Sequence, residues 1–359
     1  MMLRWVSPAG ALVGFLAGAF PLEAGVVFAQ DLREETRRGA GLTAAGAAAL
    51  EERLTANPED VVARARLLGY TSRLARQRRP GHGHTEHLLW FIRNRPEDDL
   101  LEGGAAQVLP LFDPDGYAAV KRAWLRLVEE EPDNAVFVRR TCVFLRSPDA
   151  RLAETLLERG EALEPSNPWW ARQLGRTRWR RASRAGAEPD QVAAAEVLAH
   201  LERAHALSEE RGARNLLAEM SRAALAAGET GKARAHANAL LEPAPNDPNR
   251  GDRLHSAHLL LGRAALAEGD AQGAAAHLLA AGEAAKGASA AGEAPATLRL
   301  AIRLPDLSLA RDLLAAGDRE SVLRYLQLCL EFHETYRDRI EDWIVLVEAG
   351  LTPDFRRRW

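Results

Sequence analysis

The sequence predicts an all-α protein built from helix pairs stacked in a row. Helix-forming Ala, Leu, Glu and Arg dominate its 359 residues, and no sustained alternation of β-branched and polar residues indicates a strand. A proline motif also recurs four times in the first half, with prolines 38, 36 and 33 residues apart. A stop signal repeated at such a period is typical of stacked two-helix repeats.

The proline motif predicts where helices of the first half end and begin. Its copies are Asn57–Asp60, Arg95–Asp98, Glu131–Asn134 and Glu164–Asn167. Thr43 can cap a helix over residues 44–56, and we expect Asn57 to cap the next one, because proline is favoured at the first helical position. A reversal within four residues makes neighbouring helices antiparallel. Each pair then needs its neighbours to bury its second apolar face.

Glycine-acid turns take over in the second half. Gly228-Glu229, Gly269-Asp270 and Gly317-Asp318 each lie between two apolar-periodic runs. We expect the glycine to end one helix in the left-handed conformation and the acidic residue to start the next.

The first 29 residues have the layout of a secretory signal peptide. Arg4 provides a positive start, residues 9–20 form an apolar run, and Val27-Phe28-Ala29 is a cleavage pattern before Gln30. The run is shorter than the about 20 residues that cross a membrane as a helix. We therefore expect an exported protein of the periplasm or cell envelope, with no transmembrane span after cleavage. An uncleaved N-terminal anchor is the alternative.

Composition and charge bear on the class of partner. Hydrophobic residues make up 47% and charged residues 27%, as in ordinary globular proteins. The net charge of −3 argues against nucleic-acid binding, which favours a basic surface. The basic residues are 44 Arg and only 3 Lys. A GC-rich genome would explain this bias, but guanidinium groups also bind carboxylates in a bidentate way, so their positions matter.

Several segments resemble tetratricopeptide repeats (TPR). Leu261-Gly262, Gly269-Asp270 and the run from Ala274 to Ala281 together look like one whole repeat. Leu174-Gly175 lies nine residues after Pro165, where the family has its Leu-Gly pair.

Other copies of the repeat fit less well. Leu68-Gly69 follows Pro58 with a one-residue slip, Thr141-Cys142 replaces the Leu-Gly pair after Pro132, and Pro110 interrupts the run after Pro96. As a whole, the sequence is similar to exported bacterial TPR proteins.

The resemblance implies a right-handed superhelical solenoid of antiparallel helix pairs with a concave binding face. We expect about five to six degenerate repeats over residues 30–281. An Ala/Gly-rich connector over 282–296 and a C-terminal helical cap over 297–359 would follow. Within the cap, helices are expected at 307–315, 319–335 and 336–348.

The resemblance also places side chains in the groove. In TPR proteins, the first helix of a repeat lines the groove with side chains just before, just after and one turn beyond the Leu-Gly pair. Carried onto three repeats of this protein, the rule selects Arg66, Tyr70, Arg73, Arg139, Arg146, Arg172, Arg176, Trp179 and Arg180. We expect an arginine-lined groove that binds carboxylates, either of an acidic peptide segment or of the C-terminus of a partner protein. A solvated face of an arginine-rich protein is the alternative.

Signs of metal or enzyme chemistry are weak. His82, His84, Glu86 and His87 fall within six residues, but no distant Cys or His at a recognisable spacing completes a zinc site. Cys142 and Cys329 stand alone and are expected to be buried thiols. Glycine-rich nucleotide loops, the Gly-x-Ser-x-Gly elbow and His-Glu-x-x-His are missing.

We therefore predict no catalytic residue, metal or cofactor, and a non-catalytic scaffold or adaptor that binds proteins or peptides. The alternatives are an all-helical enzyme, a metal-dependent module that uses the His82–His87 loop, and a purely structural envelope protein.

Overall fold

A computed structural model describes residues 31–77, 83–183, 189–242, 247, 249–290, 306–333 and 335–355. Every regular element in these ranges is a helix, as predicted. The predicted signal peptide, residues 1–29, lies outside the described residues.

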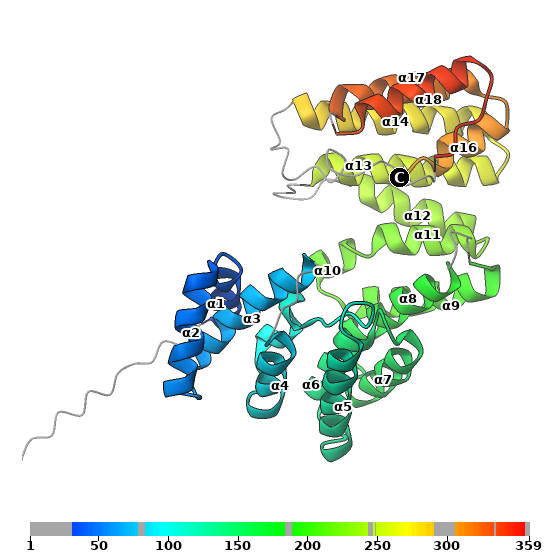
Figure 1. Cartoon of the computed structure of the whole chain (residues 1–359). Coiled ribbons are helices and arrows are strands. Elements are labelled where there is room, and N and C mark those ends of the chain that lie inside the picture. Colours follow the sequence, from blue (N-terminus) through cyan, green and yellow to red (C-terminus); the bar gives the residue numbers. More distant parts are fainter. Residues whose placement is uncertain are drawn as a thin grey trace, which may run out of the picture.

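Ten helices are described in the first half of the sequence. They are α1 (Leu32–Gly39), α2 (Ala44–Ala56), α3 (Val61–Arg76), α4 (His84–Asn94), the 3-10 helices η1 (Asp99–Glu102) and η2 (Gly104–Ala106), α5 (Pro114–Glu130), α6 (Ala135–Leu145), α7 (Ala150–Leu163) and α8 (Pro168–Ala182). From α2 to α8, each α-helix packs against the next one in sequence, and α1 packs on α3 (Figure 1).

The second half continues the row. Its described helices are α9 (Gln191–Leu207), α10 (Glu210–Arg214), α11 (Leu217–Ala226), α12 (Thr230–Leu241), α13 (Arg250–Ala267), α14 (Ala271–Ala290), α16 (Ser308–Ala315), α17 (Arg319–Phe332) and α18 (Arg337–Glu348). Helix α9 packs on α11, neighbours then follow one another to α14, and α14 contacts α16 and α17. Helix α18 packs on α17 at the far end of the row (Figure 1).

All four copies of the proline motif form the same β-turn. In each, the backbone N–H of the fourth residue donates to the carbonyl of the first at 3.0–3.1 Å, with proline in between. The fourth residue then caps the following helix: Asp60 caps α3, Asp98 caps η1, Asn134 caps α6 and Asn167 caps α8. The prediction that Asn57 caps α3 is therefore wrong. Asn57 ends α2 and opens the turn, whereas the Asp60 carboxylate accepts from the N–H of Ala63 at 2.9 Å.

An arginine also binds each of these four turns. The guanidinium donates to the carbonyl oxygen of the motif's proline, which the turn leaves unbonded. The four pairs are Arg64 with Pro58, Arg140 with Pro96, Arg159 with Pro132, and Arg203 with Pro165. Part of the arginine excess in this protein is therefore structural.

The glycine turns of the second half are confirmed. Gly228, Gly269 and Gly317 have φ of 78°, 83° and 92°, a left-handed conformation that only glycine adopts at little cost. In each, the N–H of the next, acidic residue donates to a carbonyl five positions back, at 2.8–3.0 Å. This is the Schellman pattern of a helix C-terminus.

The C-terminal region departs from prediction mainly at the expected connector. Helix α14 runs to Ala290, so residues 282–290 of the expected connector are helical, whereas 291–296 lie outside the described residues. Gly282 does not end the helix. A Cβ there would lie 2.8 Å from Leu328, so this glycine allows α17 to pack closely on α14. The three predicted helices of the cap are present, although α17 ends at Phe332.

Both cysteines are buried and free, as expected: Cys142 lies in α6 and Cys329 in α17.

Candidate functional site

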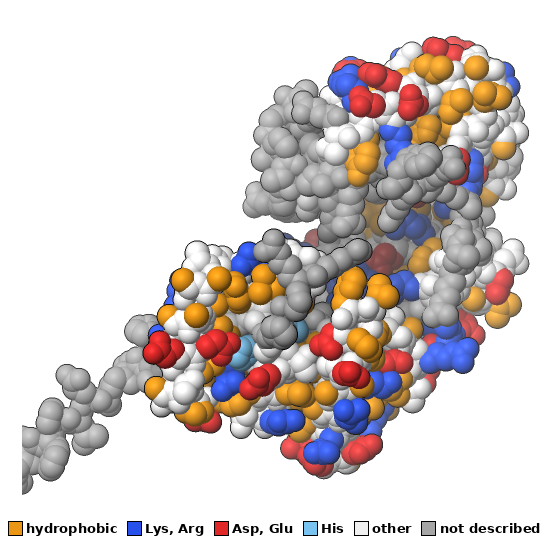
Figure 2. Space-filling view, viewed as in Figure 1, with side chains coloured by type: hydrophobic (Ala, Val, Ile, Leu, Met, Phe, Trp, Pro, Cys, Tyr) orange, Lys and Arg blue, Asp and Glu red, His pale blue; other side chains and the backbone are white. Residues whose placement is uncertain are grey.

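Four of the nine predicted groove residues line one cleft of about 860 Å³ among α6, α8, α9 and α11. We call it the arginine cleft. Its lining is Arg146, Gln173, Gly175, Arg176, Trp179, Arg180, Val197, Leu201, Glu219 and Arg222. Four guanidinium groups and one carboxylate therefore face a floor of apolar side chains. The space-filling view shows the molecule hollowed between its two ends, with basic and acidic side chains inside the hollow (Figure 2).

Helix α8 positions the centre of the cleft. Asn167 caps its first turn, and Pro168 occupies a position in that turn where its missing N–H costs no hydrogen bond. The predicted Leu-Gly pair lies on the packed side of α8. Leu174 is fully buried, and a Cβ on Gly175 would lie 3.1 Å from Leu201 of α9. This close approach leaves Arg176 and Arg180, one turn apart, on the side that faces the cleft.

Two internal carboxylates already act on arginines of the cleft. Glu219 of α11 binds Arg176 in a two-pronged ion pair: Nε donates to Oε2 at 2.8 Å, and Nη2 donates to Oε1. Arg222, one turn further along α11, acts on Asp306. Against the effect of desolvation, hydrogen bonds from Ser308 and the charges of Arg222 and Arg263 hold the pKa of Asp306 below its ordinary value. Through Arg176, the site thus binds a carboxylate of its own protein.

The remaining arginines lack such a partner. Among the described residues, neither Arg146 nor Arg180 has a carboxylate within ion-pair distance, and Arg180 donates only to the Thr177 hydroxyl at 3.2 Å. Desolvation and the charges of Arg146 and Arg176 lower the pKa of Arg180. The cleft therefore contains like charges that repel one another.

Arg172 lies beside the cleft, one turn before Arg176 in α8. Its Nε is buried and has no hydrogen-bond partner among the described groups. Desolvation and the charge of Arg176 lower its pKa, and Glu219 only partly offsets them. An unpartnered buried donor of this kind is costly, and an acceptor that reached it would recover that cost.

The predicted residues of α3 are engaged within the protein. Arg66 donates through Nε to Glu35 of α1 at 2.6 Å. Arg73 donates to the carbonyl of Leu42 at 3.0 Å, and its guanidinium lies 5.2 Å from the centre of the Tyr70 ring. These contacts fasten α1 and the α1–α2 connection to α3. The structure does not bring them to the arginine cleft.

The two arginines predicted at α6 have different surroundings. Arg139 contacts Glu102 at 3.2 Å and lies 4.9 Å from the ring centre of Trp169. Arg146 follows the last residue of α6, where it is exposed and faces the cleft. Of the two, only Arg146 is available to a ligand there.

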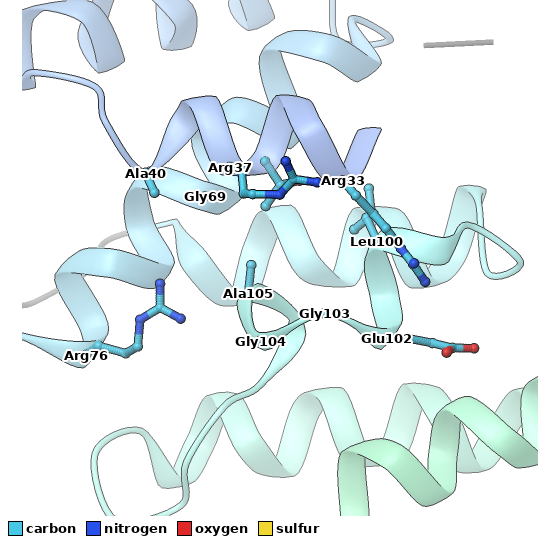
Figure 3. Close-up of a pocket in the computed structure, with 11 residues that line it drawn as sticks. Arg33, Arg37, Ala40, Gly69, Arg76, Leu100, Glu102, Gly103, Gly104 and Ala105 are labelled. Atoms are coloured by element: carbon cyan, nitrogen blue, oxygen red, sulfur yellow. The ribbon is translucent and has the colours of Figure 1, made fainter. Parts of the chain in front are cut away.

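A second cleft, of about 530 Å³, lies between α1, α3 and the two 3-10 helices. It contains none of the predicted residues, although Arg33, Arg37 and Arg76 contribute to its lining (Figure 3). Arg37 forms an ion pair with Glu34, and Arg33 donates to the carbonyl of Asp99 at 2.9 Å. We therefore regard this cleft as the weaker candidate.

The histidine loop is partly described. His84 Nδ1 lies 3.4 Å from the Thr71 hydroxyl, and His87 Nε2 lies 3.2 Å from Glu51, so the two rings have different partners. Burial lowers the pKa of His84 to about 4. His82 lies outside the described residues.

Neither a metal-ligand cluster nor a membrane span occurs in the part of the protein that the structure describes. Over those ranges, no three His, Cys, Asp or Glu side chains gather as metal ligands. Within the same ranges, no helix combines the length and the apolar character needed to span a bilayer.

Comparisons with known proteins give no match: no protein-family model fits the sequence, and a search of curated proteins finds none that matches. Sequence reasoning missed Glu219 and Arg222, because α11 follows α10 without a proline motif and so had no repeat register from which to place its side chains.

Proposed function

We propose that this protein is an exported, non-catalytic scaffold or adaptor that binds a protein or peptide in the periplasm or cell envelope. In this proposal, its helices form a right-handed superhelical solenoid of degenerate TPR-like pairs, with α16–α18 as the cap. The packing of each helix on its neighbours in sequence supports it, as do the recurring turns.

We further propose that the partner presents an acidic segment to the arginine cleft. One observation carries this step: Arg146 and Arg180 lack a carboxylate partner among the described residues, right beside an arginine that holds one. Guanidinium–carboxylate pairs are among the stronger charged hydrogen bonds. The apolar floor formed by Val197, Leu201 and Trp179 suits a neighbouring side chain of the same ligand.

A labelled peptide of ten glutamates tests the cleft by fluorescence anisotropy. We expect the peptide to bind, and the double variant Arg146→Ala/Arg180→Ala to weaken binding at least about tenfold, because hydrogen bonds to charged groups each contribute about 1.5–3 kcal/mol. Binding should also weaken as salt is added.

The matched control is Arg122→Ala/Arg126→Ala. It removes two exposed arginines one turn apart on α5, away from the cleft. Equal weakening in both double variants would indicate a general charge effect. Unchanged binding in the cleft variant would reject the arginine cleft as the site.

A further inference from the structure

Two histidines face each other between α13 and α14. His258 Nδ1 and His277 Nδ1 are 3.2 Å apart, with ring centres separated by 5.5 Å and ring planes at 33°. Both side chains are half-buried, so the pair lies at the edge of the helix interface, where water can reach it. It is separate from the arginine cleft and from the His82–His87 loop.

Gly262 explains how the rings come so close. It follows His258 by four residues, so both lie on one face of α13. A Cβ at Gly262 would lie 3.2 Å from the Cβ of His277 and from the carbonyl oxygen of Ala274. The glycine therefore lets α14 approach α13 closely, and that approach brings the two imidazoles together.

We propose that His258 and His277 bind one divalent late transition-metal ion, such as Cu²⁺, Ni²⁺ or Zn²⁺, through their two Nδ1 atoms. Two nitrogens about 2.0–2.1 Å from an ion, at the tetrahedral angle, are about 3.3 Å apart. The observed separation matches this span, and imidazole suits these metals. Since no third ligating side chain joins the pair among the described residues, water completes the coordination.

The surroundings keep the pair neutral and available. Burial lowers the pKa of both rings. The neighbouring His277 lowers the pKa of His258 further. The charge of Arg234 also lowers the pKa of His277, whereas the charge of Asp270 raises it. Arg234 is held in an ion pair with Glu268, and Asp270 accepts a hydrogen bond from the N–H of Gly273. Metal binding requires both imidazoles to carry their proton on Nε2, whereas without metal one Nδ1–H donates to the other Nδ1.

The consequence is a cross-link between two helices. A ligand that binds only the folded state raises its stability by mass action. The metal would therefore fasten α13 to α14 without contributing catalysis, and the site would exchange its ion readily because only two protein ligands hold it.

Isothermal titration of the full-length protein with ZnCl₂ or CuCl₂ tests the site. We expect one equivalent to bind and a rise in the unfolding midpoint. Because loss of even an outer-shell group weakens metal sites about 10- to 100-fold, His258→Gln or His277→Gln should weaken binding more than about tenfold. His236→Gln on α12, another half-buried histidine, should leave it unchanged.

Nitrogen NMR of the wild-type imidazoles provides a readout that needs no variant. Without metal, one Nδ1 should be protonated and hydrogen-bonded; with Zn²⁺, both Nδ1 signals should move to the range of coordinated nitrogens. If Zn²⁺ and Cu²⁺ fail to bind, or if the double glutamine variant, folded by circular dichroism, binds them equally well, the pair is only a hydrogen bond and the proposal is wrong.

Discussion

The two halves of the molecule pack their helices in different ways. The first half buries large aromatic rings, including Phe91, Trp124 and Trp170, and closes its turns with proline and arginine. The second half has more alanine in its core, and Gly262 and Gly282 let α13, α14 and α17 approach closely. Both halves bury histidine rings: His84 and His87 in the first, His255 and His333 in the second. In the second half, the close approach of α13 and α14 at Gly262 brings His258 and His277 together.

The arginine cleft lies where these two modes of packing meet. Helices α6 and α8 come from the proline-punctuated half, and α9 and α11 come from the other half. In the first half, arginines bind proline carbonyls or acidic partners on neighbouring helices. At the junction, Arg146 and Arg180 lack such partners among the described residues, since Glu219, the carboxylate that lines the cleft, is bound by Arg176. Four predictions test this contrast, in order of decreasing expected effect.

Acid should destabilise both halves, and the second half more, because burial lowers the pKa of two of its histidines to about 4 but of one, His84, in the first half. Burial lowers the pKa of His255 and of His333 to about 4, and both ring nitrogens of His333 lack a partner among the described groups. As pH falls from 6.5 towards 4, the unfolded state takes up protons that the folded core does not, so stability is lost in that window. Each buried ring contributes up to about 3 kcal/mol.

Urea unfolding followed by circular dichroism at pH 7.5 and pH 4.5 measures this loss. His333→Phe should match or exceed the wild type at pH 7.5, since no hydrogen bond is removed, and should lose less stability at pH 4.5. An equal loss in the variant and the wild type would show that His333 does not contribute.

The contribution of a turn-binding arginine to the free energy of unfolding should increase with the burial of its side chain. The Arg140 side chain is 3% exposed; it donates to the Pro96 carbonyl and contacts Asp99 and Glu102. Arg140→Ala should cost about 2–3 kcal/mol of unfolding free energy, because it removes the packing of a buried side chain together with its hydrogen bond to the Pro96 carbonyl. Arg203 makes the same contact with Pro165, but at 3.4 Å and with a 48% exposed side chain, so Arg203→Ala should cost under about 1 kcal/mol. Chemical denaturation of both variants compares them directly, and similar costs would contradict the role of burial.

The stability cost of replacing a glycine by alanine should depend on the atoms that the new Cβ would meet. A Cβ on Gly160 of α7 would lie 2.3 Å from the Trp170 ring, so Gly160→Ala should cost about 1–3 kcal/mol through overpacking. Gly269 has φ of 83° and nothing within 4 Å, so Gly269→Ala should cost only the backbone strain of about 1 kcal/mol. Thermal unfolding of the two variants distinguishes steric from conformational cost. If Gly269→Ala proved the more damaging, backbone conformation rather than packing would determine the cost of replacing these glycines.

Local chemistry explains what the sequence could predict. Thr43 caps α2 and the turn glycines adopt positive φ because the atoms involved lie within a few residues of one another. The cap of α3 was misplaced by three positions, since proline is favoured both in a helix's first turn and in a β-turn.

Long-range pairing explains what the sequence could not predict. The positions of Arg176 and Arg180 followed from one helix, but the carboxylate that binds Arg176 is 43 residues away. Arg66 and Arg139 satisfied the same repeat rule, yet they are bound by Glu35 and Glu102. No pattern in a single helix indicates which arginines another helix will neutralise.

Replacing Glu219 should have the smallest of these effects, and it tests the role of the cleft in peptide binding most directly. Its carboxylate occupies the guanidinium that an acidic ligand would otherwise reach, so it acts as an internal competitor. Glu219→Gln retains the size of the side chain and removes one negative charge, and it should tighten binding of the ten-glutamate peptide by about three- to tenfold, mainly through faster association.

The control Glu129→Gln removes one charge from an exposed position on α5 and should leave the affinity unchanged. Tightening in both variants would reflect net charge alone. Unchanged binding in Glu219→Gln, together with loss in Arg146→Ala/Arg180→Ala, would confine the ligand to the unpaired arginines and leave the Arg176–Glu219 pair a structural contact.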